Sequence, residues 1–113
     1  MKRTKLVVIA SFFFSFLVFA DYELIRQDDN VTIKRNGNEI KSVSINIVKN
    51  EVYIGTISSL MENIKSIKVN SQKNVESLRN LDMEEQAKIE ELGTARTIRM
   101  LEESIDSIIN SLE

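Results

Sequence analysis

Adjacent carboxylates are the residues in this sequence whose type and spacing come closest to supporting chemistry. Four such pairs occur, at Asp28-Asp29, Glu84-Glu85, Glu90-Glu91 and Glu102-Glu103. Neighbouring residues of a helix point about 100° apart, so the last three pairs, which lie in a region with helical spacing, do not converge on one substrate. We interpret them as solvated surface charges and not as acid/base pairs.

A calcium loop is the second candidate. Asp28, Asn30, Thr32 and Glu39 coincide with ligand positions of the loop template, but its obligatory glycine is replaced by Ile33. The segment also alternates between apolar and polar residues, which indicates a strand. We therefore expect a plain hairpin at this position.

The residues that most other catalytic, metal-binding and phosphate-binding sites require are missing from the sequence. The chain has no His and no Cys, which excludes a Ser-His-Asp triad, thiolate zinc sites, disulfides and cysteine-linked lipid anchors. Its three glycines are scattered and form no phosphate-binding loop. We expect neither enzyme activity nor a metal or cofactor.

Residues 1–20 have the pattern of a signal peptide. Three basic residues precede an uncharged run, residues 6–20, which ends in Val18-Phe19-Ala20 before Asp21. This pattern predicts export, to the periplasm or the medium, with cleavage between Ala20 and Asp21. The alternative is an uncleaved anchor in the inner membrane, although the run is shorter than the roughly 20 residues that a spanning helix needs.

The exported part is acidic and poor in aromatic residues. Three of the 15 basic residues lie in residues 1–20, whereas all 17 acidic residues follow them, and the acidic excess lies in residues 71–113. All five Phe also lie in residues 1–20. We expect no nucleic-acid binding, and membrane contact only through residues 1–20 if they stay attached. The thin aliphatic core favours a protein partner or self-association.

A β-rich segment, residues 22–54, follows the export signal. Asn36-Gly37 is the preferred pair for a type I′ turn, which places Lys34 opposite Glu39. The apolar residues change phase after Ile40. This predicts either a bulge near Lys41-Ser42 or a longer loop.

A second turn at Lys49-Asn50 would complete a three-stranded antiparallel meander. One face of this meander would carry Val43, Ile45, Ile47, Val52 and Ile54. A short helix beginning at Ser59, with Glu62 completing a capping box, is expected to cover that face. A short fourth strand at residues 65–70 is an alternative for the end of this helix.

A new helix is expected after a break at Asn70-Ser71. Asp82 and Glu85 form another possible capping box, so we expect an interruption near Asn80. We interpret Gly93 as a glycine tolerated within the helix.

The C-terminal helix carries the predicted partner-binding residues, which follow an a/d rhythm: Ile98, Leu101, Ile105, Ile108 and Leu112. Two arrangements remain open. The stripe folds back onto Val75, Leu78 and Leu81 as a hairpin, or it pairs with another chain.

Together these patterns predict an α+β fold in three parts. Residues 1–20 form a signal or anchor helix, residues 21–70 a β-meander covered by a short helix, and residues 71–113 a long helical or coiled-coil region. The layout resembles the inner-membrane spanins of phage lysis, although the β-rich segment departs from that family. We expect a small exported, non-enzymatic interaction protein, an assembly subunit or an inhibitor, that acts through its C-terminal amphipathic helix. The alternative is an anchored envelope protein with a periplasmic coiled coil and a spanin-like lysis role.

Overall fold

The computed structural model describes residues 19–113, so the predicted signal or anchor helix lies outside the described residues apart from Phe19 and Ala20. Three strands precede two helices: β1 (Tyr22–Gln27), β2 (Asn30–Arg35), β3 (Asn38–Ser44), α2 (Val48–Asn80) and α3 (Glu84–Ser111). The strands form an antiparallel sheet in the order β1-β2-β3. The predicted α+β class and a three-stranded antiparallel sheet are therefore confirmed, although one of the three strands differs from the predicted one.

The turn between β2 and β3 is the predicted one. Asn36 and Gly37 both have positive φ, 54° and 82°, as a type I′ turn requires. Lys34 pairs with Glu39, but the next pair along the strands is Ile33 with Lys41. Ile40 is thus the extra residue of a bulge, which decides between the two alternatives left open by the phase change.

The predicted third strand is wrong. Instead of a hairpin around Lys49-Asn50, the N-terminal segment supplies the strand: β1 pairs with β2 from Tyr22↔Arg35 to Gln27↔Asn30. The connecting turn has Asp28 at φ 55°, a conformation that Asp tolerates better than most residues. The short polar turn at Asp28-Asp29 was the available signal for this hairpin.

Residues 48–54 belong to α2 and not to a strand. Val52 and Ile54 are β-branched, and this favoured a strand in the sequence. However, Ile54, Ile57 and Ile64 recur at helical spacing and are buried together. Their packing outweighs the intrinsic preference. Val52 and Ile47, expected in the buried row, are exposed.

The helix α2 is continuous, which corrects three further predictions. It begins at Val48 and not at Ser59, it includes residues 65–70, and it passes Asn70-Ser71 without a break. The N-cap residue, Ile47, makes no side-chain capping bond, so the start has no sequence signature. Ser71 is buried and shares a hydrogen bond with Thr94 of α3 instead of capping a helix.

The predicted interruption near Asn80 is confirmed, but by a different motif. Asp82 has φ 59°, and its amide donates to Arg79 O (3.0 Å), while the Met83 amide donates to Leu78 O (2.9 Å). These two bonds form a Schellman motif that ends α2. Asp82 is therefore not the N-cap of α3, which is Met83. Gly93 lies within α3, as expected.

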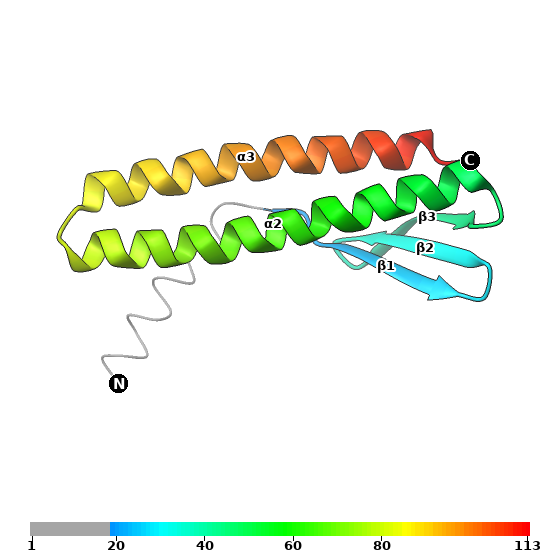
Figure 1. Cartoon of the computed structure of the whole chain (residues 1–113), viewed down its shortest axis with the longest axis horizontal. Helices are drawn as coiled ribbons and strands as arrows, with labels where there is room; N and C mark the ends of the chain where they lie inside the picture. The colour runs from blue at the N-terminus through cyan, green and yellow to red at the C-terminus, as the bar shows by residue number, and fades with distance from the viewer. Residues whose placement is uncertain (1–18) are drawn as a thin grey trace.

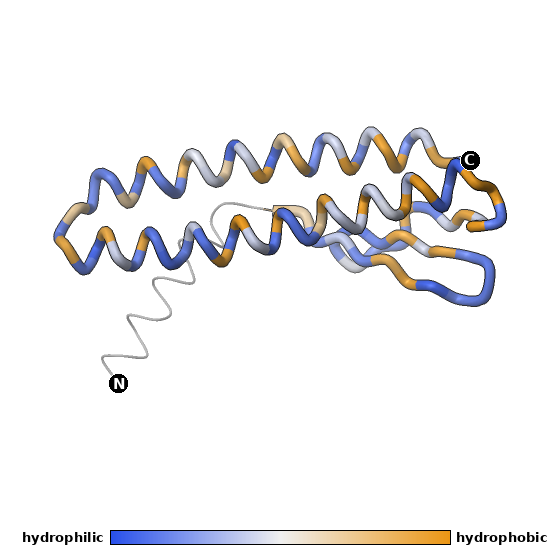
Figure 2. Tube along the Cα trace, viewed as in Figure 1, coloured by the Kyte–Doolittle hydropathy of each residue, from blue (hydrophilic) through white to orange (hydrophobic). Residues whose placement is uncertain are grey.

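The two helices form an antiparallel hairpin, and the sheet lies against it at the end where α2 begins and α3 ends (Figure 1). The buried core joins the sheet to both helices: it consists of Tyr22, Val31, Ile33, Val43, Ile54, Ile57, Ile64, Ile98, Ile105, Ile109 and Leu112. Figure 2 shows hydrophobic positions recurring along the strands and both helices. The longest dimension is 53 Å. The part of the hairpin from Ser71 to Met100 is called the distal arm below; it lies toward the α2–α3 turn, and most of it projects beyond the sheet (Figure 1).

Candidate functional site

The five predicted partner-binding residues line the inner side of α3. Ile98, Ile105 and Leu112 are buried, while Leu101 and Ile108 are half-buried against the same core. This core includes Ile54, Ile57 and Ile64 of α2, so the stripe packs near the start of α2 and not against Val75, Leu78 and Leu81. The stripe therefore packs within its own chain, but the predicted contact with Val75, Leu78 and Leu81 is wrong. A partner-binding role for these residues stays a prediction.

Two carboxylates interpreted as solvated charges are buried, and this corrects the sequence interpretation. Glu91 is 1% exposed and Glu102 is 9% exposed, whereas their neighbours Glu90 and Glu103 lie near or at the surface. Each pair therefore has one member facing the helix interface. Because α3 has charged residues on both sides, the apolar pattern did not reveal which member turns inward.

Glu102 belongs to an N-terminal cluster at the start of β1. The backbone amide of Ala20 donates to the Glu102 carboxylate, and the Tyr22 hydroxyl donates to Asp106 Oδ1 (2.6 Å). Arg35 pairs with Asp106 at 3.6 Å. Burial, with the hydrogen bond to Asp106, raises the pKa of the Tyr22 phenol well above its usual range. The phenol therefore stays neutral and acts as a hydrogen-bond donor.

A C-terminal clamp, formed by Asn50 and Lys41, holds the other end of the same face. Asn50 Nδ2 donates to Ser44 O (2.9 Å) and Glu113 O (3.3 Å), and its Oδ1 accepts from the Glu113 amide (2.9 Å). Lys41 Nζ donates to the carbonyls of Ile109 (3.0 Å) and Leu112 (2.7 Å). A lysine at free carbonyls also suits the negative end of the α3 dipole. The clamp is structural.

The distal arm has a small and polar interior. Ser71 and Thr94 share a 2.6 Å hydrogen bond, and Arg79 Nη2 donates to Glu91 Oε1 at 2.6 Å. Within residues 19–113, Glu91 Oε2 has no hydrogen-bond partner. Burial raises the pKa of Glu91, although Arg79 opposes the shift. The arm therefore combines thin packing with a carboxylate that folding drives toward its neutral form.

The outer face of α3 exposes apolar side chains along the arm. Ile89 and Met100 are each 68% exposed and Leu92 is 58% exposed. Ile89 and Met100 are about three helical turns apart, so they lie on one face. Gly93 lies between Ile89 and Met100 on this face. A Cβ atom added at Gly93 would meet no atom within 4 Å, so another protein can approach the backbone here. Sequence reasoning missed this face because it followed the cleaner inner stripe.

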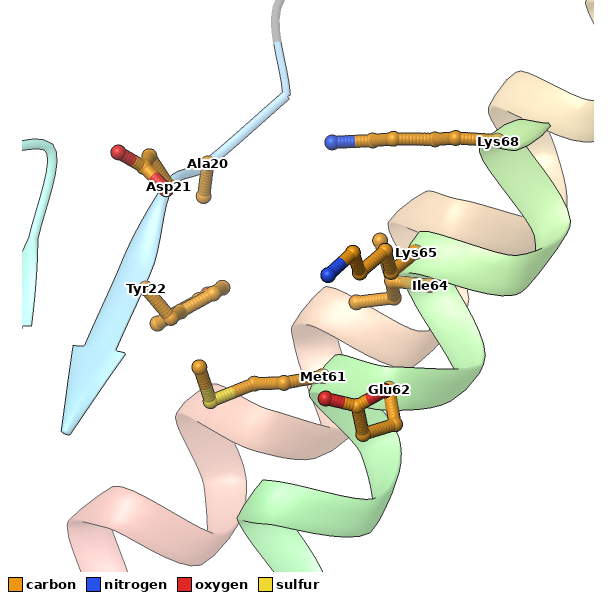
Figure 3. A pocket seen from close by; sticks show the side chains of 8 residues that line it. All are labelled: Ala20, Asp21, Tyr22, Met61, Glu62, Ile64, Lys65 and Lys68. Carbon is orange, nitrogen blue, oxygen red and sulfur yellow. The ribbon is translucent and has the colours of Figure 1, made fainter. Parts of the chain in front are cut away.

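A cavity of about 340 Å³ lies between the start of β1 and the middle of α2. Figure 3 shows the amino groups of Lys65 and Lys68 pointing from α2 toward Ala20 and Asp21. Glu62, Met61, Ile64 and Tyr22 complete the lining. The lining combines two amino groups, two carboxylates and an apolar floor of Met61 and Ile64.

Neither metal nor membrane features emerge in the described range. Among residues 19–113, no group of three or more His, Cys, Asp or Glu residues is placed to hold a metal ion. Of the calcium-template residues, Asp28 lies in the β1–β2 turn, Asn30 and Thr32 in β2, and Glu39 at the start of β3. No helix of residues 19–113 combines the length and apolar character that crossing a membrane requires.

Comparisons with protein-family models, with curated proteins and with solved structures find no match for this chain. Its function is therefore argued from its own residues.

Proposed function

We propose that this chain is a small exported, non-enzymatic interaction protein that binds a partner protein through α3. The observation that carries the proposal is the exposed apolar face of Ile89, Leu92 and Met100 on an arm that projects beyond the sheet (Figure 1). Isolated exposed apolar residues are common on soluble proteins, but three on one helix face of a projecting arm are typical of a helix-binding surface.

The outer face suits this role better than the inner stripe. Ile98 and Ile105 are fully buried in the core of their own chain, so a partner reaches them only if the hairpin opens. Opening would expose the largest side chains of a small core and is costly. The outer face needs no such change.

The arm itself supports the same role. Within residues 71–100, the large apolar side chains that are buried are Val75 and Ile98, and Ile98 belongs to the core at the sheet end. The other buried residues there are small or charged, so the arm buries less apolar area than the sheet end: Ser71, Thr94, Ala87, Ala95 and Glu91. A helix of the partner, with its own apolar stripe, would cover the exposed face and add the missing contacts. Beside that stripe, Lys88, Arg96 and Arg99 can pair with acidic residues of the partner, and the exposed Glu85 and Glu103 with basic ones.

Site-specific photo-crosslinking in the producing cell tests the proposal. A photoreactive residue at Met100 should give a cross-linked product of one defined mass, and Ile89→Lys should abolish it. The same residue at Asn63, which is exposed on α2, is the matched control and should give none. A product of twice the chain mass would identify the partner as a second copy. Absence of a product from Met100, or the same products from Met100 and Asn63, would contradict the proposal.

An anchored envelope protein is the second candidate, because Phe19 and Ala20 pack against the core. The membrane-directed segment thus joins the folded part without a linker, and an uncleaved segment would hold the sheet at the membrane surface. A spanin-like lysis role is the corresponding activity. Intact mass decides between the two: a chain starting at Met1 and extracted only by detergent supports the anchored form.

A further inference from the structure

The start of β1 holds a buried carboxylate whose donor lies on the other side of the predicted cleavage point. Glu102 is 9% exposed, and among residues 19–113 the group that donates to its carboxylate is the Ala20 amide. Cleavage between Ala20 and Asp21 removes this donor. Cleavage also removes Ala20 from beside Glu102, but the carboxylate remains next to the start of β1, where a new cation would be favoured.

The cleavage itself creates a suitable group. Hydrolysis of the Ala20–Asp21 peptide bond consumes one water molecule and releases the leader with a carboxylate at Ala20. The nitrogen of Asp21 takes up protons and becomes an α-ammonium with three donors. We propose that this α-ammonium is the ligand of the Glu102 carboxylate in the cleaved protein. The inference rests on the export and cleavage included in the proposed function.

The geometry places the new ammonium beside the carboxylate. The nitrogens of Ala20 and Asp21 belong to consecutive residues, whose Cα atoms are about 3.8 Å apart across a trans peptide bond. The Asp21 nitrogen already donates to Asn36 Oδ1 at 2.9 Å, and Asp21 O accepts from the Asn36 amide at 2.7 Å. These bonds hold Asp21 at the end of β1. Because the ammonium has three donors, one N–H keeps the bond to Asn36 Oδ1 while the Glu102 side chain turns toward another.

The charged residues around the Asp21 nitrogen include some that favour a cation there and some that oppose it. Asp106 of α3 lies beside Glu102, although Arg35 of β2 pairs with it at 3.6 Å. From α2, Glu62 favours a cation, whereas Lys65 and Lys68 oppose it across the cavity (Figure 3). Departure of Phe19 removes the ring that Lys68 faces at 5.0 Å and leaves Lys68 free to turn outward. The buried Glu102 then dominates the balance.

The α-amino group of Asp21 reports directly on this contact. The full chain is exported by a bacterial host, and the processed protein is recovered and its mass determined. The pKa of the α-amino group is then measured by nuclear magnetic resonance, for the folded protein and in urea. An opposite charge within reach should raise this pKa by about one unit or more in the folded protein. Glu102→Gln should lose that rise, while Glu103→Gln, which removes an exposed charge next to it, should keep it.

Three results would overturn the inference. The first is a recovered protein that does not begin at Asp21. The second is an α-amino group that titrates at the same pH in the folded protein and in urea. The third is a rise that persists in folded Glu102→Gln. Where that variant does not fold, Glu102→Asp retains the charge on a shorter side chain and should keep part of the rise. Loss of the photo-crosslinking product at Met100 tests partner binding separately, so the two failures are distinguishable.

Discussion

Replacing Asn50 with Ala should destabilise the protein more than any other single change at a polar residue of the sheet end. Asn50 is fully buried and makes three hydrogen bonds, to Ser44 O and to both backbone groups of Glu113. A net contribution of about 0.5–1.5 kcal/mol for each bond gives a loss of roughly 2–4 kcal/mol. This is a large share of the roughly 5–15 kcal/mol that stabilises a typical domain.

Equilibrium urea unfolding, followed by far-UV circular dichroism, measures this loss. Ala is a better helix former than Asn by about half a kcal/mol, which partly masks the effect. Asn63→Ala makes the same replacement at an exposed position of α2 and provides the correction. The reasoning would be refuted if Asn50→Ala and Asn63→Ala had the same unfolding midpoint, because the hydrogen bonds of the C-terminal clamp would then contribute nothing.

Two further predictions follow from burial. Ile105→Ala should lower the free energy of unfolding by about 2–5 kcal/mol, because Ile105 is fully buried. Ile47→Ala, at an exposed position, should lower it by less than about 1 kcal/mol. Equal urea midpoints for the two variants would contradict the packing. Folding raises the pKa of Glu91, so its contribution to stability is present at low pH and is lost as the pH rises through the folded-state value. In thermal unfolding, the stability of wild type relative to Glu91→Gln should therefore increase as the pH falls from neutral to acid. A variant that is much less stable than wild type at neutral pH would show that the ion pair with Arg79 dominates instead.

Local signals predicted the parts of the fold that depend on a few neighbouring residues. Asn36-Gly37 dictates its own turn because both residues tolerate positive φ, and the period-two pattern around it predicted β2 and β3. The α2 boundary was not predictable in this way. Ile47 offers no capping side chain, and Val52 and Ile54 prefer strands until Ile57 and Ile64 pack beside Ile54.

The candidate site depended on the same distinction. The inner stripe of α3 was correctly interpreted as apolar and helical, but its contacts within the chain follow from where α2 begins. Glu91 and Glu102 could not be identified as buried, because their partners, Arg79 and the Ala20 amide, are distant in the sequence or on another element. Sequence patterns indicate which apolar residues are buried, whereas contacts between distant residues determine which polar residues are buried with them.

The bonds between the two ends of the chain also have a kinetic consequence. Tyr22 reaches Asp106, and Lys41 and Asn50 reach the end of α3, so the packing of the sheet against the helices is completed only when the C-terminal residues are available. Contacts between such distant residues slow folding, because the loop must close before they form. A chain that is threaded across a membrane from its N-terminus would complete this core only after its last residues emerge on the far side.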